Sequence, residues 1–301
     1  RGPLMSRPIL LLGKGGQVGF ELQRALAPLG EVLALDRNAC DLADADAIGR
    51  AITAASPRII VNAAAYTAVD KAETETDVAG AVNARAPGVI GALARELGAR
   101  VIHYSTDYVF DGAKTEPYTE DDATQPLGIY GLSKRDGEAA LAASGAEHFV
   151  FRTSWVFGAH GGNFVKTILR LAAERESLDV VADQFGAPTS AALIADITAQ
   201  VIGQLAYRGG AALPSGIYHL TAAGETSWHA FAQAIVTGAR NRGRELRLQP
   251  EAIRPIATRE YPLPAPRPAN SRLDTRRLRE TFGLTLPPWQ AGLDHVLTQI
   301  L

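Results

Sequence analysis

The stretch Gly13-Lys14-Gly15-Gly16-Gln17-Val18-Gly19 follows the apolar run 9–12 and precedes an amphipathic pattern over residues 17–27. Glycines at positions 13, 16 and 19 allow a tight turn, a close approach of the backbone to a pyrophosphate, and close packing of helix on sheet. The N-terminus of the following helix favours an anion. A glycine triplet alone is a common loop, but the strand before it and the helix after it favour a nucleotide-binding turn.

Apolar runs and helical patterns alternate through the first half of the chain. We expect strands at 9–12, 31–35, 58–62, 101–105 and 148–153, and helices at 17–27, 43–55, 76–97 and 127–143. Near-continuous apolar strands joined by helices are typical of parallel sheets covered on both faces. The sequence therefore predicts an α/β fold, a Rossmann-like doubly wound parallel sheet, over residues 5–157.

The alternation weakens after Trp155. The expected elements are loops at 158–162 and 209–216, a turn at 187–189, a strand at 217–220, an extended Pro-rich segment at 254–271, and helices at 163–174, 191–205, 275–281 and 289–301. Asp274 is placed to cap the third of these helices. We expect residues 158–301 to form a smaller C-terminal substrate-binding lobe, interleaved with the first domain.

Charge and composition exclude several classes of partner. The 301 residues carry 30 basic and 32 acidic side chains, a net charge of −2, which favours neither nucleic acid nor an anionic membrane surface. A single Cys, Cys40, excludes an internal disulfide, and the six His lack metal-ligand spacing, so we assign no metal. No apolar run could span a bilayer and no secretory signal opens the chain. We expect a soluble cytoplasmic protein, with residues 1–4, before the only Met, outside its fold.

Several side chains are placed to contact a dinucleotide. Asp36 ends the second expected strand, where an acid can accept hydrogen bonds from the ribose of NADH. It is alternatively a turn residue, and Arg37 beside it could meet the 2′-phosphate of NADPH, so both cofactors stay open. Small residues at Ala63, Ala64 and Ala65 would let the backbone approach the cofactor. Asp41 and Leu42 could flank the adenine, although Asp41 could equally cap a helix.

Three further residues form a candidate catalytic group. Thr106 ends the fourth expected strand, and its hydroxyl could stabilise a developing alkoxide. Tyr130 and Lys134 lie four residues apart on one expected helix face. A Tyr titrates near ~10, and a nearby cation lowers that value, so the pair could exchange a proton with a carbonyl oxygen. Tyr-x-x-x-Lys alone is a common surface pair, and Thr106 upstream gives it weight.

The second half offers candidate substrate contacts. Trp155 follows the fifth expected strand beside a glycine-rich loop; a Trp is more often core than ligand wall. Lys166, Arg267 and Arg272 could hold a pyrophosphate, since the guanidinium binds phosphate oxygens bidentately. These cations could instead solvate an irregular surface segment.

The motifs together resemble the extended short-chain dehydrogenase/reductase family, and within it the reductases of dTDP-4-keto-6-deoxy sugars. The resemblance runs over nearly the whole chain, and the later motifs are more specific than the first. The segments that carry it are Gly13–Gly19, Val61–Asp70, His103–Phe110, Phe151–Val156, Asp183–Thr189 and Arg267–Leu273.

The resemblance implies a reaction and a set of contacts. Hydride from NADPH or NADH would reach C4 of dTDP-4-dehydro-6-deoxy-L-mannose, giving dTDP-L-rhamnose for bacterial surface polysaccharide. Thr106 would polarise the carbonyl, Tyr130 would protonate it, and Lys134 would hold the nicotinamide ribose and lower the Tyr130 pKa. Asp107 and Trp155 would contact the dTDP-sugar, with the loop 267–273 closing over it. The implied cofactor contacts are Gly13, Gly16, Gln17, Val18, Asp36, Asp41, Leu42, Ala63, Ala64, Ala65, Tyr104, Tyr130 and Lys134.

Departures and alternatives bear on this interpretation. Some members carry an acidic residue after Pro-Thr that serves a magnesium site at a dimer interface; this chain has Ala192, so we expect a homodimer without that metal. A dehydratase would need an acid where Tyr108 follows Asp107. The alternatives kept are an epimerase of the same fold, and a non-catalytic NADP-binding regulatory subunit like that of methionine adenosyltransferase.

Overall fold

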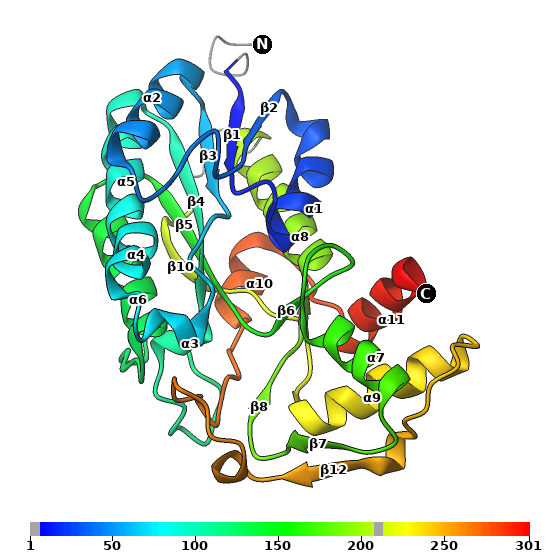
Figure 1. The fold of residues 1–301 in the computed structure, drawn as a ribbon. Coiled ribbons are helices and arrows are strands. Elements are labelled where there is room, and N and C mark those ends of the chain that lie inside the picture. Colours follow the sequence, from blue (N-terminus) through cyan, green and yellow to red (C-terminus); the bar gives the residue numbers. More distant parts are fainter. Residues whose placement is uncertain (1–6, 208–212) are drawn as a thin grey trace.

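The computed structural model describes residues 7–207 and 213–301 (Figure 1). The expected N-terminal segment 1–4 and part of the expected loop 209–216 lie outside these residues. Figure 1 shows a helix-covered sheet, with a smaller group of helices and short strands beyond the carboxyl ends of its strands.

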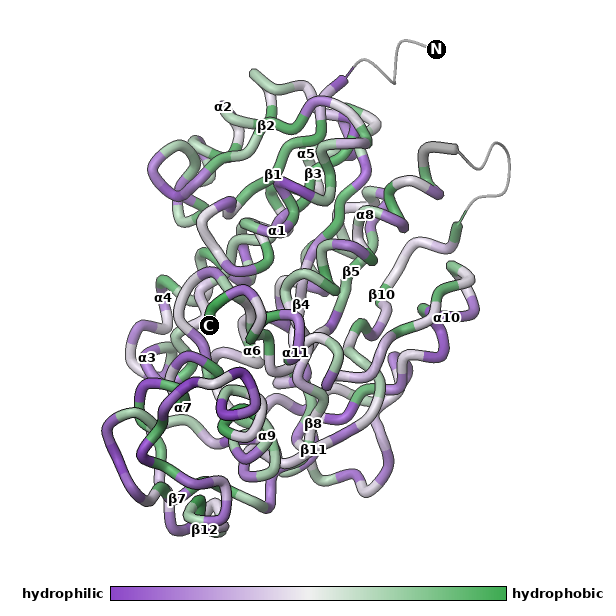
Figure 2. The backbone as a smooth tube through the Cα atoms, turned by 90° about the vertical axis from the view of Figure 1, so that its right-hand side faces the viewer, coloured by the Kyte–Doolittle hydropathy of each residue, from purple (hydrophilic) through white to green (hydrophobic). Residues whose placement is uncertain are grey.

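One six-stranded parallel sheet organises the chain. Its order is β10-β5-β4-β3-β1-β2. The strands are β1 (Ile9–Leu12), β2 (Val32–Leu35), β3 (Ile59–Asn62), β4 (Arg100–Thr106), β5 (His148–Thr153) and β10 (Gly216–His219). This confirms the predicted doubly wound parallel sheet and all five strands expected in the first half. β1 is hydrophobic throughout and β3 is hydrophobic up to its last residue, Asn62 (Figure 2), which is the pattern of strands buried on both faces.

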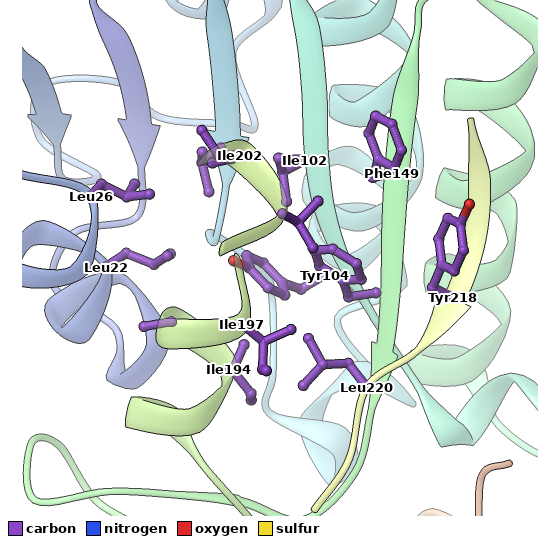
Figure 3. Packing of buried hydrophobic residues seen from close by; sticks show 14 of the residues in the cluster. Leu22, Leu26, Ile102, Tyr104, Phe149, Ile194, Ile197, Ile202, Tyr218 and Leu220 are labelled. Atoms are coloured by element: carbon purple, nitrogen blue, oxygen red, sulfur yellow. The ribbon is translucent and has the colours of Figure 1, made fainter. Parts of the chain in front are cut away.

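One face of the sheet packs on α1 (Gln17–Leu26), α8 (Ala191–Tyr207) and α10 (Arg276–Phe282). Leu22 and Leu26 of α1 meet Ile194 and Ile202 of α8 over the strands, and all four side chains are fully buried (Figure 3). Full burial of such a side chain contributes roughly 1.5–3 kcal/mol. Because α8 and β10 both follow residue 157, the second half of the chain supplies one strand of the sheet and one of the helices that cover this face.

The other face packs on α2 (Ala45–Ala55), α5 (Ala86–Leu97) and α6 (Ile129–Ala143). Ile48, Ile90 and Leu141 contribute one fully buried side chain from each helix. Asp44 caps α2 by accepting a hydrogen bond from the Asp46 amide at 2.9 Å, so Asp41 does not take that role.

A second core lies beyond the sheet. It is built from α7 (Phe164–Glu174), β7 (Leu178–Val181), α9 (Trp228–Asn241), β12 (Ile253–Ile256) and α11 (Trp289–Ile300). Phe231 is fully buried at its centre and contacts the rings of Phe157, Phe164 and Trp289. We did not predict α9, and β12 lies where the Pro-rich segment was expected to be extended and irregular.

The helix expected at 76–97 is confirmed with the same bounds, but its middle part is π-helical. It consists of α4 (Thr76–Ala79), a π-helical segment (Gly80–Arg85) and α5. Pro87, which has no N–H to donate, lies in the first turn of α5, directly after the π-helical segment. The helix expected at 275–281 begins one residue later, and Asp274 accepts a hydrogen bond from the Arg276 amide at 2.8 Å.

Candidate active site

The glycine-rich turn joins β1 to α1. Gly13 has φ +86°, and a Cβ there would lie 2.6 Å from the Ala64 nitrogen; a Cβ on Gly19 would lie 2.0 Å from the Gly13 oxygen. Glycine is therefore required at both positions. Gly16 is the N-cap of α1 and no side chain caps it. The first-turn amides of α1 are left available for an anion such as a pyrophosphate.

Asp36 follows β2 with its carboxylate between two kinds of donor. Its Oδ1 accepts a hydrogen bond from the Ala39 amide at 3.1 Å, and its Oδ2 lies 3.3 Å from Nζ of Lys14. The Ala39 amide, and then Lys14, lower the pKa of Asp36. Arg37 turns to Asp41, with the two charged groups 3.5 Å apart. Asp36 is thus a turn residue and also an exposed acceptor, and the Lys14 cation beside it was not predicted.

A cavity of about 880 Å³ runs from this turn to the carboxyl end of β4. That volume suits a large ligand. Every residue predicted to contact the cofactor lines it, and so do three of the five predicted substrate contacts. The predicted residues on its walls are Gly13, Gly16, Gln17, Val18, Asp36, Asp41, Leu42, Ala63, Ala64, Ala65, Tyr104, Thr106, Asp107, Tyr130, Lys134 and Trp155.

Thr106 and Tyr130 meet at one wall of the cavity. Thr106 is the last residue of β4, and its hydroxyl lies 3.1 Å from Oδ1 of Asp107. Burial raises the pKa of Tyr130 to about 12, while the Thr106 hydroxyl partly offsets this. Tyr130 therefore carries its proton at neutral pH, as a proton donor must. The expected lowering of this pKa by Lys134 is not seen: desolvation of the phenol dominates, and Lys134 is not among the groups that shift the Tyr130 pKa.

Lys134 lies one turn further along α6, and its side chain is buried. Its Nζ donates a hydrogen bond to the Tyr104 carbonyl oxygen at 2.6 Å and lies 3.4 Å from Nε2 of His103. Burial lowers the pKa of Lys134 to about 8, against the attraction of Glu138. An amine with this pKa can gain and lose a proton near neutral pH.

Asp107 offers a buried carboxylate to the cavity. Burial raises its pKa to about 6, and the hydroxyls of Ser271 and Thr106 partly offset that effect. Its Oδ2 is buried and has no hydrogen-bond partner in the part of the chain that the structure describes. A buried acceptor without a partner is costly, which points to a ligand that supplies the donor.

Trp155 is held in a strained backbone conformation. Its φ is +49°, which is unfavourable for a bulky side chain. Its ring stacks on Trp228 with ring centroids 3.6 Å apart, and a Cβ on Gly186 would lie 2.6 Å from it. Strain of this kind persists where surrounding structure fixes it, often at ligand sites. Trp228, on the unpredicted helix α9, had no signal in the sequence.

The predicted cations do not line this cavity. Arg267 donates to Asp70 Oδ2 at 2.9 Å, and Arg272 pairs with Glu225 at 2.9 Å beside a second, smaller cavity. The guanidinium of Arg267 lies 5.9 Å from the centre of the Tyr108 ring. Lys166 lies in the first turn of α7. Pyrophosphate binding by Arg267 or Arg272 stays a prediction.

The loop after β6 (Val156–Phe157) closes against the glycine-rich turn. His160 donates to the Gly15 carbonyl oxygen at 3.0 Å, and its ring stacks on Phe20 with centroids 4.2 Å apart. Asn163 donates to the Gln17 side chain at 3.0 Å. These contacts join two segments about 145 residues apart, which no local pattern could show.

Among residues 7–207 and 213–301, no group of three His, Cys, Asp or Glu side chains is arranged to hold a metal ion. Within the same residues, no helix has the length and hydropathy that crossing a bilayer requires.

The parallel sheet, the glycine-rich turn and the Thr106, Tyr130 and Lys134 group define a nucleotide-dependent oxidoreductase of the short-chain dehydrogenase type. The chain belongs to the family described as the RmlD substrate binding domain, whose model matches residues 6–301.

Relatives with established names support this membership. The dTDP-4-dehydrorhamnose reductase of Burkholderia thailandensis is 50% identical over 97% of this chain and 99% of its own. The crystal structure of a Clostridium acetobutylicum dTDP-4-dehydrorhamnose reductase superposes with a TM-score of 0.88 at 34% identity, over 97% of this chain and 98% of its own. The Bacillus anthracis dTDP-4-dehydrorhamnose reductase, solved with NADP, gives 0.86 at 33% identity, over 98% of this chain and 100% of its own.

Proposed function

We propose that this chain reduces the C4 keto group of dTDP-4-dehydro-6-deoxy-L-mannose with NADPH or NADH, giving dTDP-L-rhamnose. The observation that carries the proposal is one cavity with a nucleotide-binding turn at one end and Thr106, Tyr130 and Lys134 at the other. Relatives at 43–50% identity that bear the name dTDP-4-dehydrorhamnose reductase support the choice of substrate.

The residues present fit a dinucleotide. The uncapped start of α1 offers backbone amides to a pyrophosphate, and the glycines at 13 and 19 let the turn pack closely against Ala64 and against itself. Asp36 accepts from ribose hydroxyls, while Lys14 and Arg37 supply positive charge for a 2′-phosphate. Both cofactors therefore meet a favourable group at the same place.

The side chains divide the chemistry between them. The nicotinamide, when bound, supplies the hydride that reaches C4. Tyr130 donates its phenolic proton to the carbonyl oxygen as negative charge develops there. The Thr106 hydroxyl turns from Asp107 to the same oxygen and stabilises it. Lys134 holds the ribose hydroxyls and, with a pKa of about 8, can return a proton to Tyr130.

The sugar nucleotide occupies the end of the cavity at the carboxyl ends of β4 and β5, beside the loop at residues 161–163. Asp107, with its unpartnered Oδ2, accepts a sugar hydroxyl, and Trp155 forms an aromatic wall. Residues 5–157 form the cofactor-binding domain, which also supplies Asp107 and Trp155. Residues 158–301 form the substrate-binding lobe, with α8 and β10 interleaving the two parts. The protein acts in the cytoplasm as a homodimer, and its product enters a surface polysaccharide such as O-antigen.

The decisive assay follows oxidation of NADPH or NADH on addition of freshly prepared dTDP-4-keto-6-deoxy-L-sugar. Formation of dTDP-L-rhamnose in equal amount supports the proposal. A regulatory subunit would bind the cofactor without turnover, and an epimerase would retain NAD through purification. Either result would replace the reductase assignment.

A further inference from the structure

His103 lies next to Lys134, and each of its two ring nitrogens has a polar neighbour. It faces Asn62 across neighbouring strands, where Asn62 and His103 are register partners of β3 and β4, and both side chains are buried. Nδ1 of the ring lies 3.1 Å from the Asn62 amide nitrogen, and Nε2 lies 3.4 Å from Nζ of Lys134. The reaction described above gives this residue no role.

The hydrogen bonds define which ring nitrogen carries the proton. The side-chain oxygen of Asn62 accepts from the Ala64 amide at 3.2 Å, which orients the side-chain amide. The amide nitrogen of Asn62 is then directed at His103 and can only donate to it, so Nδ1 must accept. Burial and the nearby Lys134 keep the pKa of His103 well below its usual value, so the ring is neutral. A neutral ring that accepts at Nδ1 carries its proton on Nε2.

We propose that Asn62 and His103 are a positioning pair for the reductase reaction, in which Asn62 fixes the His103 tautomer so that an Nε2–H, and not a lone pair, faces the Lys134 amine. This inference rests on the proposed function. An N–H directed at Nζ opposes the ammonium form and donates to the lone pair of the neutral amine. Once Lys134 has passed its proton to the Tyr130 phenolate, His103 stabilises the amine until a solvent proton restores it.

Other groups facing Lys134 do not replace this contact. Along α6, Tyr130 lies one turn before Lys134, and Glu138 lies one turn after it. Glu138 favours the ammonium form, but it is already bound to Arg152 of β5 through two hydrogen bonds of 2.9 and 2.6 Å. From β4, the Tyr104 carbonyl accepts one proton of Lys134.

The remaining charged neighbours act on Tyr130 or His103 and not on Lys134 itself. Asp107, beyond Thr106, acts electrostatically on Tyr130, and His148 acts on His103. His103 is thus the group that presents a donor to Nζ among the residues that the structure describes.

The tautomer is measured directly by nitrogen NMR of the full chain labelled in its histidines, with His103→Gln identifying the His103 signal. We expect the Nε2–H tautomer in the wild type. We expect the Nδ1–H tautomer in Asn62→Asp, whose carboxylate still accepts from Ala64 but must accept from the ring. A wild-type ring protonated on Nδ1 overturns the proposal without any substitution and without any substrate.

The kinetic consequence separates positioning from a merely structural role. With the ring reversed, its Nε2 lone pair favours the Lys134 ammonium, so the alkaline fall of kcat/KM in Asn62→Asp moves about one pH unit higher. Asn62→Asp/His103→Gln shows no such shift relative to His103→Gln, because the effect passes through the ring. An unshifted profile in Asn62→Asp, or the same shift in both backgrounds, refutes the proposal. Inactivity of the wild type on the keto sugar would reject the function instead, and leaves the tautomer result readable.

Discussion

The guanidinium of Arg267 lies 2.9 Å from the carboxylate of Asp70, 197 residues away in the sequence. The Ala265 amide donates to the other oxygen of the same carboxylate at 3.2 Å. Asp70 belongs to the short helix α3 (Val69–Ala72) beside the cavity, so the pair fastens the Pro-rich loop to the cofactor-binding half. This contact gives Arg267 a role that does not require phosphate.

Arg267→Ala should raise KM for the dTDP-sugar roughly tenfold, about 1.4 kcal/mol, while sparing cofactor affinity, because a free loop must be ordered on binding. Titration with dTDP measures the affinity for the substrate nucleotide, and titration with NADPH measures the affinity for the cofactor. Arg254→Ala, which removes an exposed pair with Asp179, is the matched control.

Asp70→Ala decides between fastening and direct phosphate binding. If Arg267 fastens the loop, Asp70→Ala weakens dTDP as Arg267→Ala does. If Arg267 is a phosphate ligand held back by Asp70, dTDP binds Asp70→Ala more tightly. Unchanged dTDP affinity in both variants would contradict any role of Arg267 in the substrate site.

Tyr130→Phe should lower kcat by about 10²–10⁴ while leaving NADPH binding near wild type, because only the proton donor is lost. Lys134→Met should lower kcat and also weaken NADPH binding, because its amine both holds the ribose and returns a proton to Tyr130. Tyr261→Phe, an exposed phenol at 55% of full accessibility, is the control. Nearly full turnover in Tyr130→Phe would assign the acid to another group.

Both cofactors should be used with modest discrimination, because Asp36 favours a free ribose while Lys14 and Arg37 favour a phosphate. Asp36→Ala should shift the ratio of kcat/KM values toward NADPH, and Lys14→Ala toward NADH. Ratios that differ by several orders of magnitude in the wild type, or that Asp36→Ala leaves unchanged, would refute this prediction.

Trp155→Ala should weaken dTDP binding by removing the aromatic wall, with little effect on NADPH. Trp228→Phe keeps a ring behind Trp155 and should have a smaller effect. Equilibrium titration of dTDP gives the comparison, and equal affinity of wild type and Trp155→Ala would move the nucleotide base elsewhere.

Asp107 should make the fold less stable as pH rises. Its pKa is about 6 in the folded chain against an ordinary 3.8, so between these values the folded chain holds a proton that the unfolded chain has released. The free energy of unfolding therefore falls through this window.

Asp107→Asn should remove that cost and be more stable at pH 7 by on the order of 3 kcal/mol, while losing activity. Urea unfolding at pH 5 and pH 7 tests the sign. Asp136 is an exposed acid on α6 paired with Arg135, so the control variant Asp136→Asn should change neither the stability at pH 5 and pH 7 nor the activity. A gain in stability that is the same at both pH values would show that desolvation of the carboxylate is not its cause.

The sequence by itself determined the parallel sheet, because buried strands and amphipathic helices leave period and composition signals at short range. The glycine-rich turn and the spacing of Tyr130 and Lys134 were also readable, since each depends on backbone geometry within a few residues. Short-range patterns did not reveal the π-helical segment before Pro87. They also missed α9, whose Phe231 is buried by elements distant in sequence.

Only the tertiary structure decided what each candidate side chain meets. In the folded chain Arg267 donates a hydrogen bond to Asp70, and Trp228 stacks on Trp155. Desolvation, which depends on everything packed around a group, raised the Tyr130 pKa to about 12 and opposed the lowering expected from Lys134. The orientation of Asn62, and with it the His103 tautomer, follows from hydrogen bonds between adjacent strands. A sequence names such groups, but their burial and partners arise only when distant segments pack together.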